Sequence, residues 1–214
     1  MRERPILFSA PMVRALLAGT KTQTRRVVKP QFAADAIPVE MPATDPAGGW
    51  VVPGHSGVWW CDAAANPDDV RRCPYGQPGD RLWVRETFSG PWCMEAQDGA
   101  AAAPPSKWAE SSRIWYWADG EPAYGDWTRP RPSIHMPRWA SRITLEITSV
   151  RLQDISEADA IAEGVYTDPA SPAYDAYAQL WDEINGPGSW AANPWVWVLE
   201  FCRINSKEIE HAAE

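Results

Sequence analysis

Residues 18–30 have the sequence AGTKTQTRRVVKP, and the predicted fold is organised around this stretch. It contains four basic residues, three threonines and no acidic residue, in a chain whose formal net charge is -8 at pH 7. Cations and hydroxyls gathered in an otherwise acidic protein are typical of a place that holds an anionic or electron-rich group. We therefore expect this stretch to line a site.

The residues before this stretch are predicted to form a short helix. Ser9 suits its N-cap, and a proline follows in the first turn. Gly19 suits the left-handed residue that ends such a helix. Lys21 and Thr24 then lie in or just after the turn that leaves the helix, before a strand at residues 24–28. The predicted buried stripe of the helix consists of Val13, Leu16 and Leu17.

Length and composition indicate a globular chain with one core. At 214 residues, of which 45% are hydrophobic, the chain can form one sizeable core plus insertions. We expect a single domain over residues 1–214. Two irregular Trp- and Pro-rich insertions are predicted at about residues 31–77 and 89–132, the first with one hairpin around residues 58–60.

The charges are segregated along the chain. A pI near 5.0 argues against a protein that binds duplex nucleic acid without sequence preference, because such a protein needs a broad basic face. Residues 152–202 contain acidic residues but no Lys or Arg, whereas the segment between Asp126 and Glu146 contains only Arg among its charged residues, apart from one His. One basic pocket on an acidic body is the simplest arrangement.

The four cysteines have no C-x-x-C spacing. Without a signal peptide or an apolar run long enough to span a bilayer, they are interpreted as reduced thiols of a cytoplasmic protein with no membrane contact. A zinc site would have to use His55, Cys61, Cys73 and Cys93. Their spacing matches no familiar zinc knuckle, so we expect no metal and no other cofactor.

The remaining elements complete an α+β class. A helix is predicted from Ser156 to Gly164, with Glu163 in its last turn, where an acid opposes the helix dipole. A later helix over residues 171–185 has a predicted core stripe of Tyr174, Tyr177, Trp181 and Ile184. The predicted strands cover residues 6–8, 24–28, 81–88, 113–117, 143–150 and 195–201, with an extended cationic segment at 132–142. This order favours a small, strongly bent mixed sheet or barrel with peripheral short helices.

Several motifs, in this order, resemble the ASCH domain, which has a PUA-like fold. They are A-G-x-K-T-x-T-x-R, P-G-D-x-L-x-V and I-S-E-A-D-A-x-A-E-G. The chain is more similar to the larger ASCH-like proteins of phages and prophages, which share P-I-L-F-S-x-P-M-V-R, S-I-H-M-P-R-x-A-S-R and N-P-W-V-W-V. The likeness covers most of the chain except the two insertions.

The resemblance implies a β-barrel whose cleft takes a nucleoside or a base in single-stranded RNA. One branch of the family hydrolyses N4-acetylcytidine to cytidine and acetate, using a Lys and a Thr of a K-x-x-T motif and a Glu on the later helix. These match Lys21, Thr24 and Glu163. The chain is about twice as long as members of that branch, so the insertions could reshape the pocket and change the substrate.

The chemistry of these residue types is coherent with amide hydrolysis. A Thr hydroxyl needs a base to take its proton, and Lys is a base only when neutral. Burial and the neighbouring Arg25 and Arg26 would both lower the pKa of Lys21. The structural alternative is a solvated Lys21, a Thr24 bonded to backbone and a Glu163 paired with Arg26.

Further residues are candidates for substrate binding: Arg25, Arg26, His135, Arg138 and Arg142. Arg26 suits an anion or carbonyl clamp as well as a salt bridge at a barrel edge. His135 suits a base contact, although a histidine bonded to backbone is the more ordinary role. Arg138 and Arg142 suit phosphate contacts or a solvated face. Among the tryptophans, Trp83, Trp195 and Trp197 are predicted in the core, and Trp59, Trp60 and Trp139 are candidates for base stacking.

Three functions stay open from the sequence. The first is an amidohydrolase directed at a nucleoside or nucleobase, with Thr24 activated by Lys21 and assisted by Glu163. The second is a non-catalytic module that binds RNA or a modified nucleotide in the same cleft. The third is a phage accessory or morphogenesis protein. The natural substrate and the oligomeric state do not follow from the sequence.

Overall fold

The computed structural model of the chain describes residues 1–32, 37–40, 58–62, 69–92, 113–155, 162–163 and 173–204. Its strands are β1 (Glu3–Leu7), β2 (Gln23–Val27), β3 (Ile37–Glu40), β4 (Val58–Asp62), β5 (Asp69–Arg72), β6 (Arg81–Arg85), β7 (Phe88–Ser89), β8 (Trp115–Tyr116), β9 (Thr144–Asp154) and β10 (Trp195–Ile204). Its helices are α1 (Ala10–Leu17) and α2 (Ala173–Asn185), with 3-10 turns η3 (Trp117–Asp119), η4 (Ser133–His135) and η5 (Arg138–Ala140). The predicted α+β class is confirmed.

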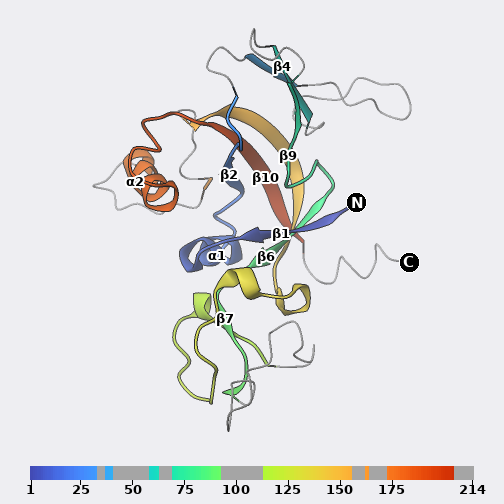
Figure 1. Ribbon diagram of the computed structural model, residues 1–214. Coiled ribbons are helices and arrows are strands. Elements are labelled where there is room, and N and C mark those ends of the chain that lie inside the picture. Colours follow the sequence, from blue (N-terminus) through green and yellow to red (C-terminus); the bar gives the residue numbers. More distant parts are fainter. Residues whose placement is uncertain are drawn as a thin grey trace, which may run out of the picture.

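A five-stranded sheet in the order β1-β6-β9-β10-β2 forms the centre of the molecule (Figure 1). Only β1 and β6 run parallel; the other neighbours are antiparallel. The edge strands β1 and β2 do not pair with each other in the described part of the chain, so no strand ladder closes the sheet there. A side chain links them instead, because the Arg26 guanidinium donates to the Leu7 carbonyl at 2.7 Å.

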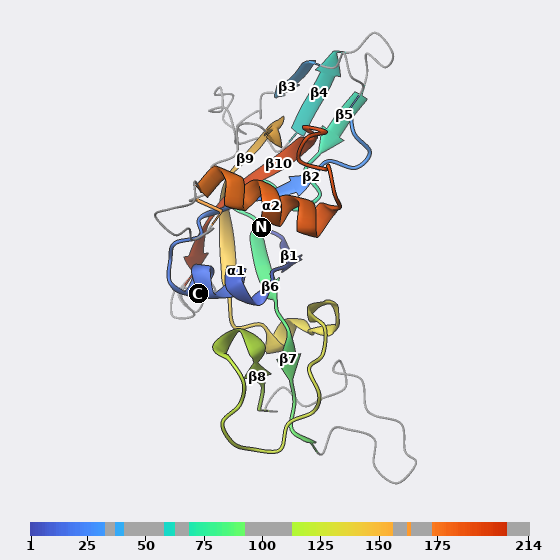
Figure 2. The ribbon, with the colours of Figure 1, turned by 90° about the vertical axis from the view of Figure 1, so that its left-hand side faces the viewer.

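The interior strand β10 is buried on both faces over its first half. The predicted set on one face is confirmed, because Trp197, Leu199 and Phe201 belong to the main core and Trp195 packs against it. The other face of β10, which carries Val196 and Val198, contacts α2 through Tyr177 and Trp181. Figure 2 shows α2 lying in front of β10 and β2. The sheet therefore has a separate apolar layer beneath α2.

One residue of each predicted buried stripe, near the end of its helix, is exposed. Leu17, the last residue of α1, is 37% exposed, and Ile184, near the end of α2, is 56% exposed. At a helix end the next turn that would continue the packed face is missing, so an apolar residue there has fewer neighbours. The positions inside the helices, Val13, Leu16, Tyr177 and Trp181, are buried as predicted. The side chain of Tyr174 lies outside the described residues, as does the predicted helix from Ser156 except for residues 162–163.

The first insertion contains more regular structure than the sequence predicts. Strands β3, β4 and β5 form an antiparallel three-stranded sheet, where a single hairpin in an irregular segment was expected. The aromatic and β-branched residues of β4 favour a strand. This strand pairs with β3 on one side and with β5 on the other. Residues 41–57 and 63–68 of this insertion lie outside the described residues.

Two other predictions needed correction in the second insertion and after it. The strand expected at residues 113–117 is reduced to the two residues of β8, and the chain then turns through η3. The segment 132–142 is not extended throughout, since η4 and η5 interrupt it. Each of these turns follows a proline, Pro132 or Pro137, whose carbonyl accepts the first hydrogen bond of the turn.

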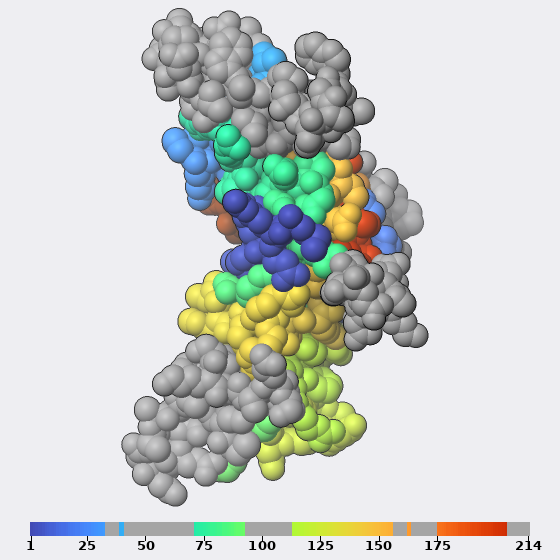
Figure 3. Space-filling model, turned by 90° about the vertical axis from the view of Figure 1, so that its right-hand side faces the viewer, coloured from blue at the N-terminus to red at the C-terminus, as the bar shows by residue number. Residues whose placement is uncertain are grey.

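The edge strand β1 lies at the surface. In Figure 3 its dark blue atoms lie between the green segment around β6 and the yellow segment that precedes β9. Its last residue, Leu7, is partly exposed, although the neighbouring Ile6 and Phe8 belong to the main core. In such an edge strand, alternate side chains pack on the core, and the side chains between them face the solvent.

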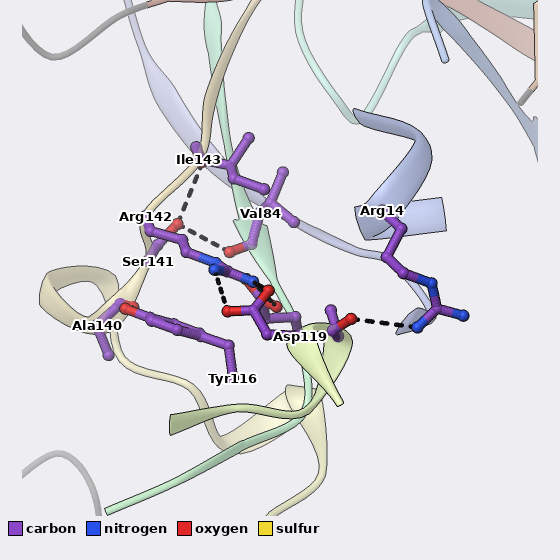
Figure 4. A network of polar contacts seen from close by, with 10 residues as sticks. Arg14, Val84, Tyr116, Asp119, Ala140, Ser141, Arg142 and Ile143 are labelled. Atoms are coloured by element: carbon purple, nitrogen blue, oxygen red, sulfur yellow. Dashed lines mark hydrogen bonds and ion pairs between the residues drawn. The ribbon is translucent and has the colours of Figure 1, made fainter. Parts of the chain in front are cut away.

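A charged network joins the segment before β9 to η3 (Figure 4). The Arg142 guanidinium contacts the Glu86 carboxylate at 2.9 Å and the Asp119 carboxylate at 2.7 Å, and it lies 4.0 Å from the centre of the Tyr116 ring. Burial raises the pKa of Glu86, and the hydrogen bonds from Arg142 oppose this shift. Arg142 therefore compensates a buried carboxylate.

We expect Arg142→Ala to lower the free energy of unfolding by about 3 kcal/mol, because it leaves Glu86 buried without its cation. Chemical denaturation followed by Trp fluorescence measures this change. The matched control is Arg138→Ala, because Arg138 pairs with Glu3 where both side chains are solvent-exposed. That change should cost less than about 1 kcal/mol. Equal losses in the two variants would contradict this account of the network.

Candidate functional site

A small cavity lies at the free edge of β2, between α1 and α2. Its volume is about 50 Å³. Because β2 is an edge strand, residues from both of its faces reach the cavity, whereas α2 supplies the opposite wall. The lining residues are Met12, Thr24, Arg25, Arg26, Val27, Glu163, Tyr177, Leu180, Trp181, Ile184 and Asn185.

A buried carboxylate, paired with two cations, lies in one wall of this cavity. The Lys21 ammonium lies 2.9 Å from Oε2 of Glu163, and the Arg25 guanidinium lies 3.1 Å from Oε1. The side chain of Lys21 is 0% exposed and that of Glu163 is 2% exposed. The structure thus brings together the Lys and the Glu that the sequence predicted to meet, although 142 positions separate them.

Local backbone geometry positions both partners. Gly19 has a φ of 75°, which turns the chain out of α1 toward β2. At the start of β2, the amides of Thr22 and Gln23 both donate to the Ala162 carbonyl at 3.0 Å. The Lys21 ammonium also donates to the backbone carbonyl of Glu163 at 2.6 Å. Together with the ion pair, these hydrogen bonds hold residues 162–163 against the edge of the sheet.

Burial and the neighbouring charges shift the pKa of Lys21 in opposite directions. Burial lowers the pKa of Lys21, the Glu163 carboxylate raises it, and the neighbouring Arg26 and Arg25 lower it again; the net direction is downward. Burial raises the pKa of Tyr177 far above its ordinary value, and the nearby Glu163 carboxylate adds to the shift. The Tyr177 phenol therefore remains a hydrogen-bond donor at neutral pH.

Glu163, rather than Lys21, faces the cavity. Lys21 is absent from the cavity wall and lies behind the carboxylate, with its ammonium 5.5 Å from the centre of the Phe8 ring. Thr24 lines the cavity from the same strand as Arg25 and is also buried. The cavity is therefore lined by a threonine and by a glutamate whose carboxylate contacts two cations.

One neutral N–H group beside the cavity lacks an acceptor within the described part of the chain. The indole Nε1 of Trp181 is buried and unpartnered there. Along β2, even-numbered residues bond to β10, as the Thr22 carbonyl and the Val28 amide do. Odd-numbered residues turn their backbone groups to the free edge, and Arg25 and Val27 of this set line the cavity. A ligand carbonyl would satisfy a buried donor whose lack of an acceptor costs free energy.

The other predicted binding residues are distributed differently. Arg25 and Arg26 line the cavity. His135 is exposed in η4, Arg138 pairs with Glu3, and Arg142 is engaged by Glu86 and Asp119. None of these three lines the cavity. A ligand contact by them stays a prediction, and the geometry gives Arg142 a structural partner instead.

The tryptophans predicted to stack on bases are placed only in part. Trp139 packs against a small apolar cluster that includes Phe88 and Met136. The side chains of Trp59 and Trp60 lie outside the described residues. Trp83, predicted in the core, is buried, with the Arg85 guanidinium 4.5 Å from its ring centre.

Sequence reasoning missed the contribution of α2 to the site. Tyr177 and Trp181 were predicted as core residues, and they are buried, but each also borders the cavity. Asn185 and Leu180 were not singled out. The helical spacing places Tyr177, Trp181 and Ile184 on one stripe. Tyr177 and Trp181 carry polar atoms in this apolar stripe, and that signal could have pointed to a site.

No group of potential metal ligands occurs among the residues that the structure describes. Burial raises the pKa of Cys73 to about 11, which disfavours the thiolate that a zinc ligand requires. His55 and Cys93 lie outside the described residues, and Cys61 is described only by its backbone. Neither described helix has the length and apolar character needed to cross a bilayer.

We expect Lys21→Met to lower the free energy of unfolding by about 3 kcal/mol, because it removes one cation from a buried carboxylate. Thermal and urea denaturation measure this change. Lys29→Met is the matched control, since Lys29 is exposed and should shift stability by less than about 0.5 kcal/mol. Adding Glu163→Gln to Lys21→Met should restore part of the loss. A Lys21→Met variant as stable as the unmodified chain would contradict a buried pair.

Comparison of the chain with protein-family models, with curated proteins and with solved structures gives no match.

Proposed function

We propose that the chain is a metal-independent amidohydrolase that acts on N4-acylated cytosine nucleosides, with the cavity at β2 as its active site. One observation carries this proposal: the Lys21 ammonium and the Glu163 carboxylate are 2.9 Å apart and buried, and the buried Thr24 lines the same cavity as Glu163. Acyl transfer needs a nucleophile and, in the same site, groups that can take up and return its proton.

The resemblance to the ASCH domain supports the same assignment. Its K-x-x-T motif corresponds to Lys21 and Thr24, which here lie in the turn after α1 and at the start of β2. We further propose that the bent sheet is a PUA-like barrel whose edges β1 and β2 are bridged by the side chain of Arg26 rather than by a strand ladder. The hydrogen bond from Arg26 to the Leu7 carbonyl supports this bridge.

In the first half of the proposed reaction, Oγ1 of Thr24 attacks the acyl carbonyl carbon, and its proton passes to the Lys21–Glu163 pair. The tetrahedral oxyanion accepts a hydrogen bond from a donor at the cavity, for which Trp181 Nε1 is available. The bond from carbon to the exocyclic nitrogen then breaks. The pair returns its proton to that nitrogen, and cytidine leaves.

In the second half, water adds to the acyl-threonine while the pair takes a proton from it. The bond between the acyl carbon and Oγ1 breaks, and the pair returns its proton to Oγ1 of Thr24. Acetic acid leaves and loses its proton to the solvent, which gives acetate. Each proton taken by the pair is returned within the same half-reaction. The lowered pKa of Lys21 supports this use, because a base works best when its pKa is close to the working pH.

The size of the cavity supports an acyl group as its occupant. A volume of about 50 Å³ exceeds what one water needs. It is too small for a whole nucleoside, so the base and sugar would lie at the mouth. Met12, Leu180 and Ile184 give part of the lining an apolar character that suits a methyl group.

Acetate release from N4-acetylcytidine tests the proposal. We expect turnover by the unmodified chain and losses of at least about 100-fold in Thr24→Ala, Lys21→Met and Glu163→Gln. Thr20→Ala is the matched control, because Thr20 lies in the same turn but is exposed and should keep full activity. Circular dichroism verifies that each variant is folded. Absence of turnover with any acylated cytosine nucleoside would count against an enzyme.

A non-catalytic module that binds a modified nucleotide is the second candidate. It is favoured by the completeness of the ion pair, because both carboxylate oxygens of Glu163 already contact cations. Such a pair can serve structure alone. Saturable binding of N4-acetylcytidine without hydrolysis would support this candidate. A role in phage morphogenesis stays a prediction from the sequence.

A further inference from the structure

A second hollow lies next to the cavity and shares three residues with it. Its volume is about 370 Å³, and the shared residues are Arg26, Val27 and Asn185. The remaining lining residues come from the end of β2, from β5 and the turn after it, and from β10: Val28, Lys29, Arg71, Arg72, Pro74, Tyr75 and Trp197. A molecule that filled the cavity could therefore extend into this hollow without leaving the protein surface.

The hollow is cationic on several sides. Arg26 and Lys29 come from one segment, and Arg71 and Arg72 come from β5. No carboxylate of the described residues lines it. Four like charges around one hollow repel one another, and an anion that enters it would relieve this repulsion.

Three of these cations, Arg26, Lys29 and Arg72, make no ion pair with the described residues. The Arg26 guanidinium donates to the Leu7 carbonyl, a neutral acceptor, and makes no ion pair with the described residues. Lys29 and Arg72 are exposed and likewise make no ion pair there. Arg71 donates to the Pro30 carbonyl and lies 4.1 Å from the centre of the Phe32 ring, which orients its guanidinium.

Neutral donors complete the lining. The Tyr75 phenol and the Asn185 amide can each donate a hydrogen bond, and Asn185 stands between the hollow and the cavity. Guanidinium forks with neutral donors beside them suit the several oxygens of a phosphate. Trp197 is buried beneath the hollow and closes its floor.

From this geometry we infer that the cationic hollow binds a phosphate of the same ligand whose acyl group enters the cavity. The substrate of the site is then a nucleotide, either free or within single-stranded RNA, rather than a neutral nucleoside. This inference rests on the proposed function only for what enters the cavity; the hollow and its charge stand apart from catalysis.

Binding measurements test the phosphate subsite directly. We would titrate the full chain with cytidine, with cytidine 5′-monophosphate and with a cytidine-containing RNA hexamer, using calorimetry at two salt concentrations. We expect the monophosphate to bind at least about tenfold more tightly than cytidine. Lys29→Ala with Arg72→Ala should abolish this advantage and leave cytidine binding unchanged. The matched control, Arg113→Ala with Arg203→Ala, removes two exposed arginines outside the hollow and should keep it.

The RNA arm distinguishes the two sources of phosphate. If the hexamer binds more tightly than the monophosphate, with a steeper salt dependence whose slope falls by about one for each of the two cations removed, the ligand is RNA. If the hexamer and the monophosphate bind alike, one phosphate suffices and the ligand is a nucleotide. Equal affinities for cytidine and its monophosphate, or an advantage that survives in the double variant, would overturn the inference.

Hydrolysis assays separate failure of this inference from failure of the proposed function. N4-acetylcytidine and its 5′-monophosphate would be compared as substrates of the unmodified chain and the double variant. If neither is hydrolysed while phosphate-dependent binding persists, the subsite stands without the enzyme. If both are hydrolysed with equal kcat/KM in both proteins, the enzyme stands and the subsite is refuted. A higher kcat/KM for the monophosphate that disappears in the double variant supports both.

Discussion

A buried carboxylate that must be neutralised is the constraint on which the rest of this site depends. Glu163 is almost entirely shielded from water, and such a charge is tolerated only where cations and hydrogen bonds replace the water. Lys21 and Arg25 supply the cations, and they come from the turn after α1 and from β2. The pair therefore joins two segments far apart in the chain and determines where the edge of β2 can form a cavity.

The edge position of β2 gives this cavity its mixed character. An interior strand has neighbouring strands on both sides. An edge strand has one on a single side, so a row of its backbone groups is left without strand partners. Thr24 and Arg25 consequently reach the same space, and α2 covers it from the far side. The same edge continues to Lys29, where the cationic hollow begins. One strand thus connects an acyl-sized cavity with a site suited to an anion.

Much of the core followed from periodicity, because alternating apolar residues can be satisfied only by a half-buried strand. Ile143, Leu145 and Ile147 are buried as their alternation predicts. The predictions were less accurate where apolar patterning is weak. The sheet of β3, β4 and β5 depends on pairing between strands that are separate in sequence. The contact of Arg142 with Glu86 likewise joins residues 56 positions apart, and no local pattern indicates it.

By itself, the sequence determined the α+β class, the positions of α1, α2, β9 and β10, and a basic turn that includes Lys21 and Thr24, since helix caps, glycines and alternation are local signals. Only the tertiary structure decided that Glu163 faces the cavity with Lys21 behind it, and that Tyr177 and Trp181 border the same space. It also decided that cations from β2 and β5 surround one hollow. These relations depend on contacts between distant segments, and the residues of one segment carry no information on which partner will neutralise or cover them.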